Sequence, residues 1–187
     1  MSQYYFLASM LPPLEIGHRP LLPYEELKSL LDEALTPFDN KKLVLLRRLV
    51  DIGNIRSFIC SEPLAPWGNL SYSQLEEALT SQEGLPDYVF DFYNKHSSHE
   101  ERIRHFSQLF ASFFEEAISQ TTGFLRDYFI FEREWRLIMM GFRAKKLNRD
   151  LVAELQYEDP EDLTVAHLLA QKDARSYEPP HGYEDLK

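Results

Sequence analysis

The sequence predicts an all-α protein, an irregular bundle of about seven to nine helices that form one lobe or two. A chain of 187 residues with 44% hydrophobic content has enough apolar side chains for a sizeable core. Its 13 Phe, 10 Tyr and 2 Trp, together with only 7 Gly, favour helices packed by large side chains over a turn-rich β fold. Apolar residues also recur at helical spacing in several long segments.

The first two elements precede residue 35. Residues 4–10 form a short apolar segment that ends at Pro12 and Pro13, and either a helix or a strand is compatible with it. Residues 23–34 predict a helix, because Pro23 stands in the first turn and two glutamates follow it near the positive end of the helix dipole.

A longer helix should follow, capped at its start by Asp39 or Asn40. It carries an apolar stripe that continues toward Phe58: Leu43, Leu46, Leu49, Val50 and Ile52. Pro63, Pro66 and Gly68 then predict a loop. We expect a boundary between two sub-lobes near residues 63–70, within one helical domain that spans residues 1–170.

Capping boxes predict where the next helices begin. Either Ser71 with Gln74 or Ser73 with Glu76 starts a short helix. Residues 87–96 are compatible with a short aromatic helix. Beyond them, Ser97 or Ser98 with a glutamate three residues later opens a long helix that continues to Gln120.

Residues 123–146, GFLRDYFIFEREWRLIMMGFRAKK, carry the most regular helical pattern in the chain. Large apolar side chains recur there at alternating steps of four and three: Phe124, Tyr128, Phe131, Trp135, Ile138 and Phe142. If the whole segment is helical, they share one face of a helix about 36 Å long. We expect this face to pack against the preceding helix in an antiparallel pair.

The C-terminal part becomes acidic. Residues 150–157 and 160–170 predict two shorter helices, and the polar, proline-bearing residues 171–187 predict a disordered acidic tail. Residues 150–187 hold ten acidic and three basic residues, so most of the formal charge of −10 lies there. Such a charge excludes a general nucleic-acid binder, because phosphate neutralisation needs a basic face.

Few features of the sequence point to chemistry. The sequence has one group of possible metal ligands, which consists of His96, His99 and Glu100. Because these residues lie on both sides of the expected helix start, their side chains should not point toward one metal ion. No phosphate-binding glycine loop or nucleophile elbow can be drawn. We therefore expect a non-catalytic protein without cofactor or metal.

The expected location is cytoplasmic. Cys60 is the single cysteine, which fits a reducing compartment, and the N-terminus lacks the pattern of a secretion signal. No apolar run is long enough to span a bilayer, so contact with a membrane should be indirect, through a partner.

Polar residues beside the stripe of residues 123–146 are the candidate docking residues. Glu132 and Arg136 are spaced i, i+4 on a second stripe that also carries Leu125, Phe129, Met139 and Arg143. This spacing is compatible with an exposed intrahelical ion pair, which would have little consequence. It is also compatible with a paired contact that fixes how a neighbouring helix or subunit docks.

Three segments together resemble a known family: the start YYFLASMLP, the helix LPYEELKSLLDEAL and above all FLRDYFIFEREWRLIMMGFRAKKL. They resemble short bacterial proteins of unassigned function that are similar to the C (d) subunit of V-type and archaeal-type rotary ATPases. The resemblance implies an all-helical subunit or accessory protein that links the central stalk to the proteolipid ring, or aids assembly. The chain has roughly half the length of a full C subunit.

The resemblance also implies partners and contact residues. The partners would be other rotary ATPase subunits, of the central stalk or the ring, at the inner membrane. Its motif region maps onto Tyr128, Glu132, Arg136, Arg143 and Lys145 as docking or interhelical contacts.

Two other functions remain open. One is a cytoplasmic helical adaptor or regulator unrelated to the ATPase, with the acidic C-terminal segment recruiting a basic partner. The other is a small enzyme whose site has no recognisable motif.

Overall fold

The computed structural model describes residues 4–174, 177–180 and 182–183, and in this part of the chain all regular structure is helical. The all-α prediction is therefore confirmed. The ten helices are α1 (Tyr5–Met10), α2 (Tyr24–Ala34), α3 (Pro37–Ile59), α4 (Tyr72–Ser81), α5 (Asp87–Lys95), α6 (His99–Arg104), α7 (Ser107–Gln120), α8 (Phe124–Lys146), α9 (Leu151–Glu154) and α10 (Leu163–Ala170). The number exceeds the predicted seven to nine, because residues 4–10 form a helix and the long helix expected to end at Gln120 is divided.

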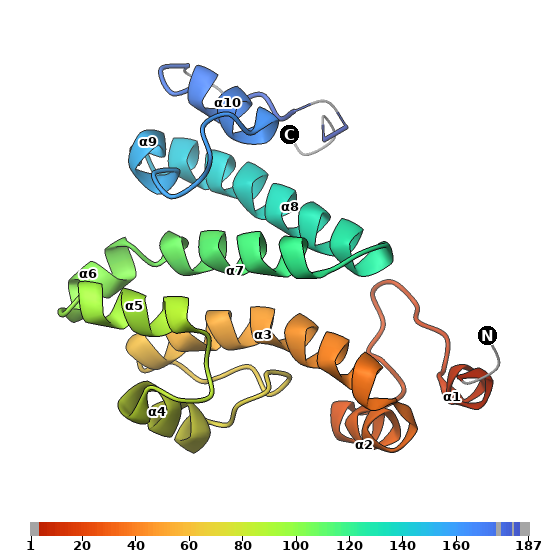
Figure 1. The fold of residues 1–187 in the computed structure, drawn as a ribbon. Coiled ribbons are helices and arrows are strands. Elements are labelled where there is room, and N and C mark those ends of the chain that lie inside the picture. The colour runs from red at the N-terminus through yellow and green to blue at the C-terminus, as the bar shows by residue number, and fades with distance from the viewer. Residues whose placement is uncertain (1–3, 175–176, 181, 184–187) are drawn as a thin grey trace.

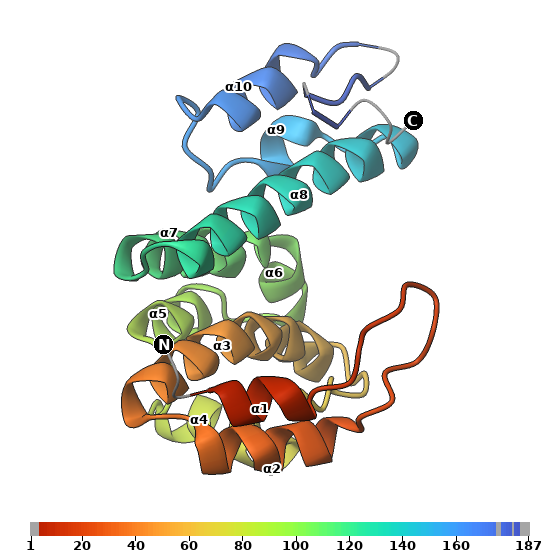
Figure 2. The ribbon, with the colours of Figure 1, turned by 90° about the vertical axis from the view of Figure 1, so that its right-hand side faces the viewer.

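The helices are stacked in layers, and from α7 onward the layers follow the order of the chain. Figures 1 and 2 both show α2 and α4 at one end, then α3 with α5, then α7, then α8, with α9 and α10 at the other end. α7 contacts α3 and α5 on one side and α8 on the other. α8 also contacts α9 and α10, so it connects the two ends of the stack.

Two separate clusters of buried apolar side chains hold this stack together. The larger one, the first core, lies between α3, α4, α5, α7 and the first half of α8. The smaller one, the second core, consists of Leu137, Ala144, Leu151, Leu155, Val165 and Leu168. α8 takes part in both, with Phe129 in the first core and Leu137 and Ala144 in the second.

The predicted packing face of α8 is only partly correct: Tyr128 packs against the first core, but Phe124 and Phe131 are exposed. Phe124 is 84% exposed and Phe131 is 48% exposed, whereas Phe129 is completely buried and meets Phe113 of α7 with ring centroids 5.6 Å apart. The second stripe, which includes Phe129 and Arg136, therefore faces α7. Of the first stripe, Ile138 is fully buried. The buried side changes along α8 because α7 covers its first half and α9 and α10 cover its second half.

The helix predicted to run to Gln120 is interrupted at His105 and Phe106. Ser98 caps α6 through a capping box with Glu101, which is one of the two predicted alternatives. After α6, the His105 ring stacks on His96 at 4.6 Å between centroids, and its Nδ1 lies 2.7 Å from the hydroxyl of Tyr157. Phe106 enters the first core against Phe92. These tertiary contacts outweigh the continuous helical pattern of the sequence.

α3 begins earlier than predicted. Its N-cap is Thr36, whose hydroxyl accepts a hydrogen bond from the backbone amide of Asp39, and Pro37 occupies the first turn. Asp39 and Asn40 therefore lie within the helix. For α4, the structure selects the capping box of Ser71 and Gln74.

The loop of residues 63–70, where a sub-lobe boundary was expected, is fastened to α3. Asn54 accepts a hydrogen bond from the amide of Ala65 and donates one to its carbonyl, at 2.8 and 3.0 Å. Asp51 accepts hydrogen bonds from the backbone amide and the side chain of Asn69, both at 2.7 Å. The separation between the two cores lies along α8.

The segment of residues 171–187 was expected to be disordered, but its described residues pack on α8. Tyr177 meets Phe142 with ring centroids 4.4 Å apart. Lys145 donates hydrogen bonds to the carbonyls of Lys172 and Ala174 at 2.7 and 2.8 Å. Gly141 permits this approach, because a Cβ there would lie 2.8 Å from the Tyr177 ring. For residues 175–176, 181 and 184–187 the prediction lies outside the described residues.

Candidate functional site

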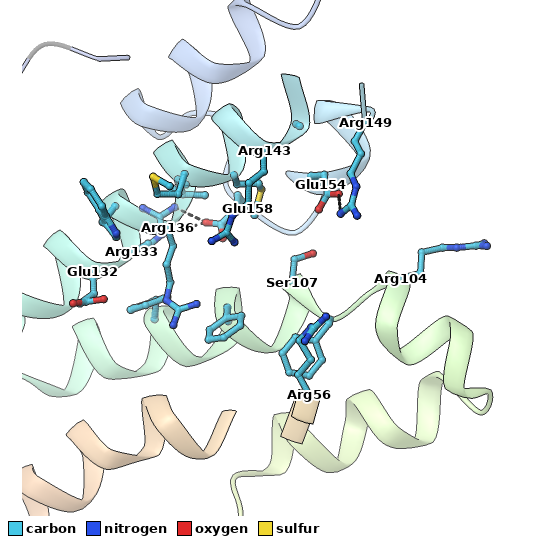
Figure 3. A pocket seen from close by; sticks show the side chains of 18 of the residues that line it. Arg56, Arg104, Ser107, Glu132, Arg133, Arg136, Arg143, Arg149, Glu154 and Glu158 are labelled. Carbon is cyan, nitrogen blue, oxygen red and sulfur yellow. Dashed lines mark hydrogen bonds and ion pairs between the residues drawn. The ribbon is translucent and has the colours of Figure 1, made fainter. Parts of the chain in front are cut away.

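A cleft of about 590 Å³ opens between α7 and the second half of α8, with α6, α9 and the segment after α9 at its edges (Figure 3). Its walls combine apolar side chains, among them Phe110, Trp135 and Met139, with a concentration of charge. The charged side chains of its lining are Arg56, Arg104, Arg133, Arg136, Arg143, Arg149, Glu132, Glu154 and Glu158. We call this cleft the arginine cleft. Its excess of positive charge stands out in a chain with a net charge of −10.

Arg136 is the central side chain of the arginine cleft. Its guanidinium carbon lies 4.0 Å from the centre of the Phe110 ring, in a cation–π contact. Its Nε is buried and has no hydrogen-bond partner within the described part of the chain. Burial lowers the pKa of Arg136. The Glu132 carboxylate opposes this effect, and the positive charge of Arg143 adds to it to a smaller extent. The cleft therefore holds a cation whose environment does not fully compensate its charge.

Two further arginines of the cleft have no carboxylate partner within the described part of the chain. Figure 3 shows Arg136 and Arg143 extending from α8 toward α7, while Arg104 extends outward from α6. Among the described residues, neither Arg104 nor Arg143 has an acidic group within the 4.0 Å limit of an ion pair. Arg143 and Arg104 thus remain able to bind a carboxylate or another anion.

The other arginines of the cleft are paired. Arg133 binds Glu158 at 2.7 Å and Asp162 at 2.8 Å, which ties α8 to the chain between α9 and α10. The Arg133 guanidinium also helps to lower the pKa of Asp162 against the opposing effect of burial. Arg149 approaches Glu154 at 3.5 Å, and Arg56 approaches Glu62 at the same distance. These pairs stabilise the fold, whereas Arg104, Arg136 and Arg143 have no ion pair with any carboxylate in the described part of the chain.

Replacement of Arg133 by Met should destabilise the end of the molecule that contains the second core by about 2 kcal/mol. Glu158 would lose its cation in a site where its side chain is only 10% exposed. The loss of stability is smaller than for a fully buried pair, because water partly solvates this one. Relative to the unaltered protein, the variant should show a larger acceleration of hydrogen exchange in α10 than in α7, measured by mass spectrometry. Arg126→Met, an exposed change on the same helix, is the control. Equal acceleration in α7 and α10 would contradict a local role.

The structure places the five predicted contact residues in three different environments. Arg136 and Arg143 lie in the arginine cleft, with Glu132 at its edge. Tyr128 packs against the first core, and burial followed by the nearby Glu132 carboxylate raises its pKa. Lys145 binds backbone carbonyls of the C-terminal segment. The mapping from the resemblance therefore grouped side chains that do not share one site.

The ion pair predicted from the i, i+4 spacing of Glu132 and Arg136 is not formed. Within the described residues, no ion pair of 4.0 Å or less involves either side chain. Arg136 turns onto Phe110 instead, and Glu132 attracts it from a longer distance. The sequence reasoning missed Arg104 and Phe110 because they come from α6 and α7, and no local pattern relates them to α8.

The described residues show no grouping of three or more His, Cys, Asp or Glu side chains suited to a metal ion. His96 is buried, stacks on His105 and lies 3.3 Å from Gln108, while His99 is exposed at the start of α6. Likewise, within the described part of the chain, no helix combines the length and the apolar character needed to cross a lipid bilayer.

Fold and site together define an all-helical protein with two cores and an open arginine cleft. The chain belongs to the family described as "Protein of unknown function (DUF2764)", whose model matches residues 1–187. It is similar to proteins named as uncharacterized from three species of Chlamydia. The identities are 34% to the protein of Chlamydia muridarum, 33% to that of Chlamydia trachomatis serovar D and 36% to that of Chlamydia pneumoniae.

Each of these alignments spans 193 positions and covers 100% of this chain and 73% of the relative. No solved structure matches the chain significantly. The expected resemblance to the C (d) subunit of rotary ATPases is wrong as a family assignment. The family that covers the whole chain carries no link to that subunit, and neither do the names of the three relatives.

Proposed function

We propose that this protein is a non-catalytic helical interaction protein that docks a protein partner at the arginine cleft. One observation carries the proposal: Arg136 is held over Phe110, beside the cation of Arg143, and neither has an ion-pair partner among the described residues. Two like charges close together oppose each other, and burial weakens the solvation of one of them. Negative groups from a partner would offset both effects.

The form of the cleft supports docking of a macromolecule. It is bounded by several helices, and large apolar side chains such as Trp135 and Met139 lie beside its arginines. Aromatic side chains and arginines are the residue types that contribute most often to protein interfaces.

Photo-cross-linking in cells that produce the protein tests this proposal. A benzophenone amino acid at position 135 would lie in the cleft, and the same group at position 163, where Leu163 is 88% exposed on α10, serves as the control. We expect a discrete cross-linked partner from position 135 that is absent from position 163. The double variant Arg136→Met/Arg143→Met should lose most of this product. Identical products from both positions, or none from position 135, would rule out docking at the cleft.

The narrower role as a rotary ATPase subunit depended on the family resemblance that the comparisons overturn, and nothing else in the structure supports it. Recruitment of a basic partner by the acidic C-terminal segment is the other role considered from the sequence. The described part of that segment contacts α8 through Tyr177 and Lys145. Deletion of residues 171–187 would therefore remove packing contacts together with acidic side chains, and would not isolate such a role.

A further inference from the structure

The arrangement of charge and apolar surface along α8 indicates what kind of partner the arginine cleft accepts. We propose that its occupant is an acidic amphipathic helix of a partner protein, with two carboxylates about two helical turns apart and apolar residues between them. This inference rests on the proposed docking function and adds the chemistry of the partner.

The two free cations set the spacing of the carboxylates. Arg136 and Arg143 are seven residues apart on one helix, so their backbone positions are separated by about 10 Å along its axis. A guanidinium presents a planar fork of donors that matches a carboxylate. A partner helix that lies along α8 would present acidic residues at i and i+7 to meet both arginines.

An apolar row lies on α8 beside the arginines, and two of its members, Trp135 and Met139, line the cleft. Phe131, Trp135 and Met139 follow one another at i, i+4 and i+8 on α8. Phe131 is 48% exposed and its ring stacks on that of Trp135 with centroids 6.5 Å apart. A free phosphate or a small carboxylate would make no apolar contacts with this row. An amphipathic helix would cover it with apolar side chains, as in other helix-in-groove complexes.

The remaining charges of the cleft argue against a polyanion. Glu132, Glu154 and Glu158 belong to the same walls, and the chain as a whole carries a net charge of −10. A nucleic acid would bring closely spaced phosphates into contact with these carboxylates. Two separated carboxylates can reach the arginines and avoid the glutamates, which favours an acidic protein segment.

Fluorescence of Trp135 provides the test. The chain has two tryptophans, so the full-length Trp67→Phe variant has Trp135 as its single tryptophan. It would be titrated with a designed helical peptide that carries Glu at i and i+7 and Leu on the same face. The matched peptides replace both Glu by Lys, or place the two Glu at i and i+3. We expect saturable binding of the first peptide, at least tenfold weaker binding of the other two, and weakening by salt.

Charge reversal on the protein completes the test. Arg143→Glu changes an exposed side chain and should leave the fold intact, yet weaken binding of the first peptide at least tenfold. Arg126→Glu, on an exposed part of the same helix, should not affect this binding.

Equal affinity for the Lys peptide would overturn the proposal, and so would full competition by inorganic phosphate or free glutamate at peptide concentrations. A partner cross-linked from position 135 without peptide binding would refute the acidic helix alone, whereas peptide binding without a cellular partner would refute the docking function.

Discussion

Phe129→Ala should lower the free energy of unfolding by about 3–5 kcal/mol. Phe129 is completely buried and its ring meets that of Phe113 at 83° between planes, which is the main aromatic contact between α8 and α7. Truncation would remove the transfer free energy of the ring and leave a cavity between two helices. Urea denaturation followed by far-UV circular dichroism measures the change.

Phe124→Ala is the matched control on the same helix. Phe124 is 84% exposed, so its truncation should change the free energy of unfolding by no more than about 0.5 kcal/mol. The pair distinguishes between the two possible packing faces of α8. A larger loss from Phe124→Ala than from Phe129→Ala would mean that the face predicted from the sequence is the one in contact with α7.

Asp51→Ala should destabilise the protein by about 3 kcal/mol, because it leaves buried donors without an acceptor. Asp51 is 2% exposed, and one of its oxygens accepts hydrogen bonds from the backbone amides of Asn69 and Leu70 at 2.7 and 3.2 Å. The other oxygen accepts the side-chain amide of Asn69 at 2.7 Å. Burial raises the pKa of Asp51, while these hydrogen bonds act in the opposite direction.

The effect of Asp51→Ala should also be local. The amides of Asn69 and Leu70 should exchange with solvent much faster by NMR, since each loses its acceptor. Asp91→Ala on α5, where the side chain is exposed, is the control and should be nearly neutral. Unchanged exchange at Asn69 and Leu70 would show that Asp51 does not hold the loop of residues 63–70 on α3.

Local signals explain why many helix starts were predicted well. Ser71 with Gln74 and Ser98 with Glu101 form capping boxes, whose two hydrogen bonds depend only on residues three positions apart. The start of α3 was misplaced because Thr36 competes with Asp39 for the cap. In the structure Asp39 also accepts hydrogen bonds from Tyr4, at the start of α1, and from Lys42. These two and Thr36 lower the pKa of Asp39 to about 2.

The candidate site could be predicted only in part. Arg136 and Arg143 were identified because they lie on one helix beside a regular stripe. The cleft itself could not be predicted, since Phe110 belongs to α7 and Arg104 to α6, and their approach depends on how the helices stack. The ion pair expected between Glu132 and Arg136 fails for the same reason, because an aromatic ring on another helix offers Arg136 a competing contact.

The amino-acid sequence by itself determined the helical class, the capping of individual helices and the uneven distribution of charge, because composition and short-range spacing are sufficient for these. Only the tertiary structure decided which side of α8 is buried. Residues 123–146 carry two apolar stripes, and helical periodicity cannot choose between them when different neighbours cover the two halves of one helix. The same stacking of α7, α8 and α9 places Arg136 and Arg143 in a common cleft, where neither forms an ion pair with a carboxylate of the described residues.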